Sequence, residues 1–184
     1  DLTKAAFDDD GFYRIGDAAK FEDENDPKKG IVFDGRVSEN FKLSSGTWVF
    51  VGGLRTKIVS ACPTVIQDAV ITGHDREKLG LLIFPNIEGC RTLVTDNERE
   101  MSLSHLIEKS PIQELLKTAI KNYNIDNYGS STRICRALLM DEAPNIDAGE
   151  ITDKGYINQR AVLNRRENLV EKLYSEDPSV IVFD

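Results

Sequence analysis

Asp17 is the first residue whose setting suits the binding of a nucleotide. It follows Gly16 directly, at a glycine bend between two short strand-like stretches. A carboxylate held rigidly at a strand end can accept two hydrogen bonds from a ribose diol. The motif is short and stands alone, so a surface carboxylate in solvent is the plainer interpretation of the same residues.

Lys154 lies in a second candidate stretch, residues 147–155. The loop contains this single lysine, carries a glycine on each side of it and runs directly into a predicted helix. An ammonium group on a mobile loop can approach a developing phosphoryl or carboxyl oxyanion and stabilise its charge. The alternative is a helix-capping loop, in which Thr152 or Asp153 is the N-cap and Lys154 stays in solvent.

The third candidate stretch, residues 31–42, is a junction between two kinds of structure. Three apolar residues end in the turn dipeptide Asp34-Gly35, and Arg36 and Lys42 then flank a polar run. Cationic side chains on both sides of a flexible junction suit a swivel that carries positive charge toward a phosphate. A surface turn with two solvated basic residues is the alternative.

Other constellations that would indicate an enzyme have little support. His74 and His105 lie far apart in the sequence, and no serine or cysteine stands in a nucleophile-elbow context, which disfavours a hydrolytic triad. The pair Gly52-Gly53 is too sparse for a phosphate-binding loop or a dinucleotide fingerprint. The charged stretches above are the remaining candidates.

Composition limits the kinds of partner that we expect. The chain has 184 residues, with 31 acidic and 23 basic side chains and a formal net charge of −8. This balance excludes a general attraction to nucleic acid or to an anionic membrane. No apolar run is long enough to span a membrane. Three widely spaced cysteines, Cys62, Cys90 and Cys135, fit neither a disulfide framework nor a metal site, and indicate reduced thiols in a cytoplasmic protein.

The first part of the chain predicts a small antiparallel β meander. Residues 12–15 are aromatic and β-branched, and a glycine bend separates them from a second strand over residues 17–21. A charged loop follows, and residues 31–33 return as the third strand. Three short strands are marginal alone, so this segment needs another surface to pack against.

The remainder predicts an α+β domain in which helices cover a small sheet. Apolar periodicity and turn signals give the order of elements. The expected elements are extended segments over 41–51 with a tight turn at 44–46, a helix over 54–62, a hairpin of strands over 65–72 and 79–84, an ambiguous segment over 87–99, two helices over 102–123, a strand over 133–140, a loop over 144–155, a helix over 157–174 and an edge strand over 177–184. We expect a domain boundary after Arg36, dividing the chain into residues 1–36 and 37–184.

The joint order of these pieces resembles a known family. Residues 12–17, then 33–36 with Lys42, then 149–154 resemble the closing third of the adenylate-forming superfamily, which comprises acyl- and aryl-CoA synthetases, amino-acid adenylation domains and luciferases. The resemblance covers nearly the whole chain. It implies a small mixed sheet in the mobile carboxy-terminal lid domain of such an enzyme.

Three longer stretches are similar to feruloyl-CoA synthetases and related acyl-CoA ligases, namely residues 34–49, 70–75 and 147–162. This resemblance implies a carboxylate–CoA ligase that uses ATP with Mg²⁺ and then CoA, with a ferulate-like hydroxycinnamate or a fatty acid as substrate. Residues 1–36 would form the end of a large N-terminal domain of the same chain. That domain would supply most of the residues that bind ATP and Mg²⁺. The 184 residues alone are therefore expected to be inactive.

The resemblance also implies roles for individual residues. Asp17 would hold the ribose hydroxyls, and Arg36 would contact the ribose or the α-phosphate. Lys154 would be catalytic, bridging the attacking carboxylate and the phosphate. The segment before Lys154 differs from the usual sequence of the family, because Asp153 stands where a glycine usually precedes the lysine.

For the second step, the resemblance implies a rotation of the small domain. Ser38 occupies the hinge position, where the family usually has aspartate or lysine. Rotation about it would withdraw Lys154 and present Lys42, Ser45 and Gly46 on a CoA-facing surface. Two alternatives remain: adenylation followed by transfer to a carrier protein, and a non-catalytic binding module.

Overall fold

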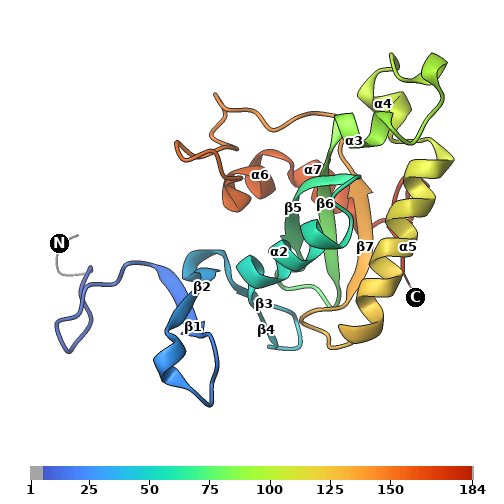
Figure 1. The fold of residues 1–184 in the computed structure, drawn as a ribbon. Coiled ribbons are helices and arrows are strands. Elements are labelled where there is room, and N and C mark those ends of the chain that lie inside the picture. The colour runs from blue at the N-terminus through green and yellow to red at the C-terminus, as the bar shows by residue number, and fades with distance from the viewer. Residues whose placement is uncertain (1–5, 184) are drawn as a thin grey trace.

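The computed structural model describes residues 6–183, apart from the side chain of Asp34. Figure 1 shows a small β hairpin at one end of the molecule, joined to a larger body in which helices cover a sheet. The predicted α+β class, with an antiparallel β segment before a mixed sheet, is confirmed.

The hairpin consists of β1 (Asp17–Phe21) and β2 (Ile31–Arg36), which pair antiparallel with an irregularity near the start of β1. A short 3₁₀ turn, η1 (Pro27–Lys29), lies in the connection. The strand expected over residues 12–15 is reduced to a single bridge between Tyr13 and Phe7, whose rings lie 5.6 Å apart. Isolated short strands gain little from pairing, so a single bridge and a ring contact remain.

The hairpin leads into the body through η2 (Val37–Glu39), a 3₁₀ turn. The chain then forms a second hairpin of β3 (Phe41–Lys42) and β4 (Trp48–Val49), with the predicted tight turn between them. Gly46 has a φ of +83°, a left-handed conformation that glycine adopts without steric cost.

The body is built on a four-stranded sheet in the order β5-β6-β7-β8. β5 (Ile66–Thr72) and β6 (Leu79–Pro85) form the predicted antiparallel hairpin. β7 (Ile134–Leu139) pairs with β6 in parallel, which requires a long crossover. β8 (Ile181–Val182) is the predicted edge strand, and it pairs antiparallel with β7. The sheet is therefore mixed.

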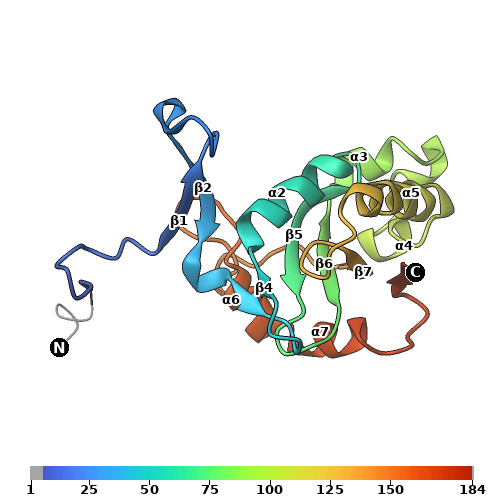
Figure 2. The same ribbon diagram turned by 90° about the horizontal axis from the view of Figure 1, so that it is seen from below.

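Helices cover both faces of this sheet, with α2 and α5 on one side and α6 and α7 on the other (Figure 2). Among the described residues, none of the helices has the length and apolar character needed to cross a bilayer. The helices are α2 (Val51–Ala61), α3 (Ile87–Arg91), α4 (Leu103–Leu106), α5 (Ser110–Asp126), α6 (Gln159–Arg165) and α7 (Glu167–Leu173), and a 3₁₀ turn, η3 (Asp96–Glu98), precedes α4.

The central strands are buried on both faces, because successive side chains point to opposite sides of a strand. In β6, Leu81 and Ile83 belong to the cluster beneath α2 and α5, whereas Leu82 and Phe84 belong to the cluster beneath α6 and α7. All four are at most 2% exposed. This buried sheet is the centre of the body that forms one side of the candidate site.

The single helix expected over residues 157–174 is instead two helices that meet at Arg166. The backbone there has φ −107° and ψ 34°, outside the α-helical region. The side chain of Arg166 is only 3% exposed and turns inward to a buried carboxylate, that of Glu150. Apolar spacing continues through the break, which is why the periodicity predicted one helix.

Candidate functional site

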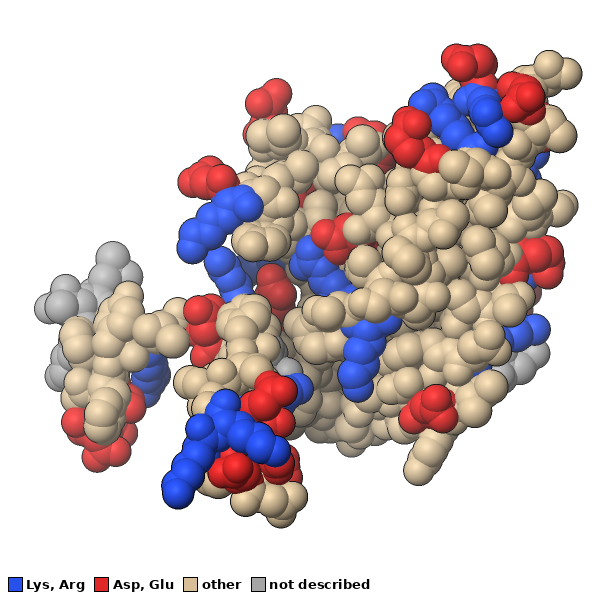
Figure 3. All heavy atoms as spheres, in the orientation of Figure 1, with Lys and Arg blue, Asp and Glu red and all other residues tan. Residues whose placement is uncertain are grey.

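A cleft of about 640 Å³ lies between the β1–β2 hairpin and the body. Its walls come from β1 and β2, from η2, from α2 along most of its length, from the start of β5 and from the loop before α6. Figure 3 shows this hollow, with basic and acidic side chains close together around it. Its volume falls in the range of small-molecule sites, so it is large enough for a nucleotide-sized ligand.

Asp17 and Arg36 both line this cleft. They begin β1 and end β2, respectively, and the antiparallel register places them opposite each other. Residues opposite each other in such a pair have neighbouring side chains. Both side chains are exposed, so a ligand in the cleft can reach them. The hairpin thus places one acceptor and one cation side by side.

Lys154 lines the same cleft from the body side. It occupies the tip of a tight turn whose base is a bridge between Ile151 and Ile157. Within the turn, the amide of Thr152 donates to the carbonyl of Tyr156 at 2.8 Å. The capping interpretation of this loop is wrong, because Asn158 is the N-cap of α6 and accepts a hydrogen bond from the backbone of that helix.

The structure therefore brings together three residues that lie far apart in the sequence. Asp17, Arg36 and Lys154 line one cleft. Among the described residues, the side chains of Arg36 and Lys154 form neither a hydrogen bond nor an ion pair with the protein. Two exposed cations that face one cleft suit an anionic ligand such as a phosphate.

Arg55 and Asp68 also line the cleft, and neither was singled out in the sequence. Arg55 on α2 donates two hydrogen bonds to the carboxylate of Asp68 on β5, at 2.7 and 2.6 Å. A further Arg55 nitrogen lies 3.4 Å from the carbonyl oxygen of Ile157, at the foot of the Lys154 turn. The pair thus connects the sheet to the loop, and Asp68 neutralises the charge of Arg55.

Glu39 adds a half-buried carboxylate to the cleft wall. Burial raises its pKa, while the nearby Arg55 and Arg36 act in the opposite direction. The backbones of β2 and α2 meet closely beside it, at Gly35, whose φ is +93°. A Cβ on Gly35 would lie 2.8 Å from the Cα of Gly52, so only glycine permits this approach.

Glu150 and Arg166 form a buried ion pair behind the Lys154 turn. Their side chains are 0% and 3% exposed, and the two Nε/Nη–Oε distances are 2.7 and 2.8 Å. The Arg166 hydrogen bonds hold the pKa of Glu150 at about 2, well below its usual value. The two residues lie 16 positions apart, so no local sequence signal revealed the pair.

The residues predicted for the second step lie elsewhere. Lys42, Ser45 and Gly46 belong to the β3–β4 hairpin and are exposed, and none of them lines the cleft. The Lys42 ammonium lies 4.9 Å from the ring centre of Trp48. Ser38, the predicted hinge residue, is exposed in η2, between the two hairpins.

A metal site is not evident within residues 6–183. No group of three or more histidine, cysteine, aspartate or glutamate side chains is arranged to hold an ion there. The Asp68 carboxylate in the cleft is already occupied by Arg55. The described residues therefore do not by themselves form a Mg²⁺ site.

The structure thus combines a helix-covered mixed sheet with a lysine turn that lines a cleft beside a small hairpin. The chain belongs to the family described as AMP-binding enzyme C-terminal domain, whose model matches residues 43–178. It is thereby a member of the adenylate-forming superfamily, as the sequence resemblance implied.

Two Arabidopsis thaliana proteins are similar in sequence. One, named probable acyl-activating enzyme 16, chloroplastic, is 26% identical over 94% of this chain and 24% of its own length. The other, long-chain-fatty-acid–[acyl-carrier-protein] ligase AEE15, chloroplastic, is 25% identical over 94% of this chain and 23% of its own length. The chain thus spans about a quarter of these relatives.

Solved structures share the fold. The adenylation domain of carboxylic acid reductase from Segniliparus rugosus, in complex with AMP and a co-purified carboxylic acid, matches 95% of this chain and 25% of its own, with a TM-score of 0.70 and 21% identity. The adenylation domain of a Mycobacterium chelonae carboxylate reductase matches 94% of this chain and 24% of its own, with a TM-score of 0.67 and 20% identity.

Proposed function

We propose that this chain is the carboxy-terminal portion of an ATP-dependent carboxylate ligase. The enzyme would activate a carboxylic acid as its adenylate and then transfer the acyl group to a thiol. One observation carries the proposal: Asp17, Arg36 and Lys154, which come from three separate stretches, line the same cleft. The family membership and the names of the relatives support it.

In the first step, a carboxylate oxygen attacks the α-phosphorus of ATP, and the bond to pyrophosphate breaks. Asp17 would accept hydrogen bonds from the ribose hydroxyls, and Arg36 would contact the ribose or the α-phosphate. The ammonium of Lys154 would lie between the attacking carboxylate and the phosphate, where it stabilises the charge of the transition state. In the second step, a thiol attacks the acyl carbonyl and AMP leaves.

The two steps would use different orientations of the small domain. We assign residues 1–36 to the end of a large N-terminal domain and residues 37–184 to the mobile lid, with Ser38 as the hinge. Lys154 lines the cleft while Lys42, Ser45 and Gly46 lie outside it, which suits the adenylation step. Rotation about Ser38 would exchange these surfaces and bring the β3–β4 hairpin to the thiol.

CoA is our proposed acceptor, and an aryl acid such as a ferulate-like hydroxycinnamate, or a fatty acid, is our proposed substrate. A carrier protein is the second candidate acceptor, because one relative is named as an acyl-carrier-protein ligase. Mg²⁺ would arrive with the ATP phosphates and be held mostly by the large domain. The cysteines are unpaired, which suits a reducing compartment such as the cytoplasm.

Measuring the two half-reactions of the full-length ligase tests the proposal. Lys154→Ala should lower carboxylate-dependent ATP–pyrophosphate exchange about 100- to 1,000-fold, as expected for loss of a group that stabilises transition-state charge. Transfer from supplied acyl-adenylate should be largely retained. Lys57→Ala is the matched control, because Lys57 is exposed on α2 and does not line the cleft. Equal loss of both half-reactions would contradict the assignment.

Two further measurements separate the alternatives. Comparing CoA with a phosphopantetheinylated carrier protein as acceptor distinguishes the two thiols. A non-catalytic binding module predicts that charge removal at Asp17, Arg36 and Lys154 leaves biological activity unchanged. The isolated 184-residue chain should release no pyrophosphate, and robust turnover by it would refute the view that the rest of the site lies in another domain.

A further inference from the structure

The loop that carries Lys154 is long, and one buried side chain holds several parts of it. Residues 140–158 connect β7 to α6 without helix or strand. The guanidinium of Arg166 donates to the carbonyl oxygens of Glu142 and Ala143, at 2.9 and 2.8 Å, and to both carboxylate oxygens of Glu150. Arg166 thus connects the part of the loop that follows β7 to the part that leads toward α6.

The pair is fully enclosed and well satisfied. The second carboxylate oxygen of Glu150 also accepts from the amide of Asn145 at 2.7 Å, and Arg165 approaches it at 3.3 Å. The ring of Phe84 lies 5.0 Å from the Arg166 guanidinium. Buried ion pairs often add little net stability over apolar replacements, whereas their hydrogen bonds fix geometry. Such a pair suits the task of positioning a loop.

Glu150 lies at the base of the Lys154 turn, so its position determines where that turn begins. The backbone carbonyl of Glu150 accepts a hydrogen bond from the amide of Asn158 at 2.8 Å, which closes the base of the turn. The bridge between Ile151 and Ile157 follows immediately. Glu150 is therefore fixed through both its side chain and its backbone, four residues before the lysine.

We propose that Arg166 and Glu150 are positioning residues that hold the Lys154 turn at the cleft for the adenylation step. This inference rests on the role proposed for Lys154. Neither residue lines the cleft, so neither would touch a ligand bound there. The break between α6 and α7 belongs to the same arrangement, because it accompanies the inward turn of the Arg166 side chain beneath the loop.

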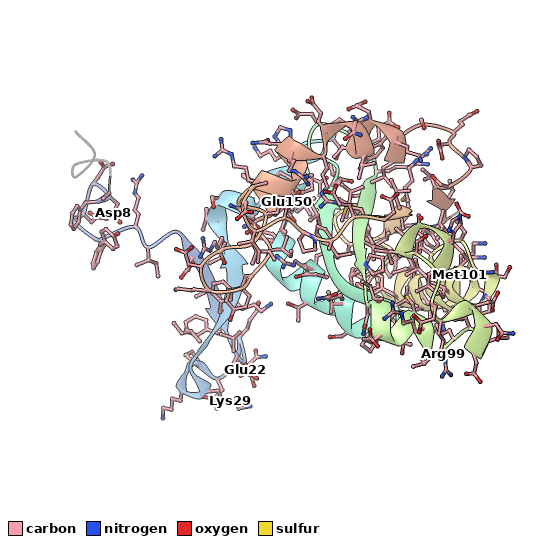
Figure 4. The ribbon with its side chains drawn as sticks, turned by 90° about the horizontal axis from the view of Figure 1, so that it is seen from above. Asp8, Glu22, Lys29, Arg99, Met101 and Glu150 are labelled. Atoms are coloured by element: carbon pink, nitrogen blue, oxygen red, sulfur yellow. The ribbon has the colours of Figure 1, made fainter. Side chains whose placement is uncertain are left out.

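Hydrogen exchange of the full-length ligase tests the structural half of the inference. Glu150→Gln should raise the exchange rate of amides in residues 151–158, where the turn hydrogen bonds lie. Glu98→Gln is the matched control: Glu98 pairs with Lys109 at 2.5 Å, in a distant part of the molecule. In Figure 4, its neighbours Arg99 and Met101 lie at the far end from the hairpin, beyond Glu150. Unchanged exchange in 151–158 would overturn the proposal.

The half-reactions test the functional half. Glu150→Gln should lower the kcat of adenylation about 10- to 100-fold, as expected when a catalytic group is misplaced by about 1 Å. The KM for ATP and transfer from supplied acyl-adenylate should stay near those of the unmodified enzyme. A loss that is equal in both half-reactions, or matched by Glu98→Gln, would overturn the proposal.

A second variant separates positioning from stability. Glu150→Gln combined with Arg166→Met removes both charges together, so no buried ion is left without its partner. The double variant should unfold at a temperature near that of the unmodified enzyme and still lose adenylation. Recovery of adenylation with restored stability would show a purely structural role. If the unmodified full-length enzyme showed no adenylation, that result would refute the proposed function itself, independently of this inference.

Discussion

Neutralising Glu150 should destabilise the protein far more than neutralising an exposed glutamate. In Glu150→Gln, the new amide keeps one acceptor oxygen, but its NH₂ group faces a guanidinium that can only donate. Arg166, which is 3% exposed, then keeps its charge, and the carboxylate that remains near it is that of the exposed Glu142, at 3.9 Å. Removing one partner of a buried ion pair costs about 3–5 kcal/mol, and we expect about 3 kcal/mol because one acceptor remains.

Urea unfolding of the 184-residue chain, followed by circular dichroism, measures this difference. For a chain of this size, about 3 kcal/mol corresponds to a fall of about 6–12 °C in melting temperature. Glu114→Gln provides the comparison, because Glu114 and Lys117 are 67% and 38% exposed and such surface pairs contribute about 1 kcal/mol or less. A cost below about 1 kcal/mol for Glu150→Gln would refute the reasoning.

The pH dependence gives an independent check of the same pair. The Arg166 hydrogen bonds lower the pKa of Glu150 from 4.5 to about 2 in the folded state. Its stabilising contribution is therefore complete above about pH 4.5 and is lost as the pH falls toward 2. The stability difference between unmodified protein and Glu150→Gln should shrink over that window. A difference that stays constant would contradict the assignment of the shift to this carboxylate.

Three further outcomes are expected. Asp17→Ala should raise the KM for ATP about 10-fold or more, because hydrogen bonds to a charged acceptor contribute about 1.5–3 kcal/mol, and steady-state kinetics of the full-length ligase measures it. Gly35→Ala should cost about 1–3 kcal/mol in urea unfolding, since its Cβ would lie 2.8 Å from the Cα of Gly52. Gly30→Ala, with a φ of +94° but open space around it, is the control and should cost less. Lys42→Ala should slow transfer to the thiol and leave pyrophosphate exchange unchanged, and loss of exchange would count against its place on the thiolation face.

Much of the fold follows from local pattern. The apolar runs of β5, β6 and β7 read as buried strands, and the structure places them within a few residues of the expected bounds. The tight turn at 44–46 also matches, and the helix expected over 54–62 is present, although it begins earlier, at Val51, because spacing and turn residues act over a few positions. Residues 12–15 and the helix over 157–174 differ, since pairing partners and burial override local preference there.

The sequence by itself determined which residue types are available for chemistry. The sequence shows each of them directly: Asp17 follows a glycine, Arg36 follows a turn, and Lys154 lies in a loop flanked by glycines. Their order carried the family resemblance, which the match over residues 43–178 confirms. Whether these three side chains can bind one ligand depends on the distances between them in the folded protein. Their spacing along the chain does not give those distances.

Only the tertiary structure decided how those residues are held. The β1–β2 register aligns Asp17 with Arg36, and the loop before α6 brings Lys154 to the same cleft. The pair of Glu150 and Arg166 depends on contacts between distant positions, and nothing in either neighbourhood marks it. Buried ion pairs form only where folding removes water from both charges, so their partners become evident in space and not in sequence.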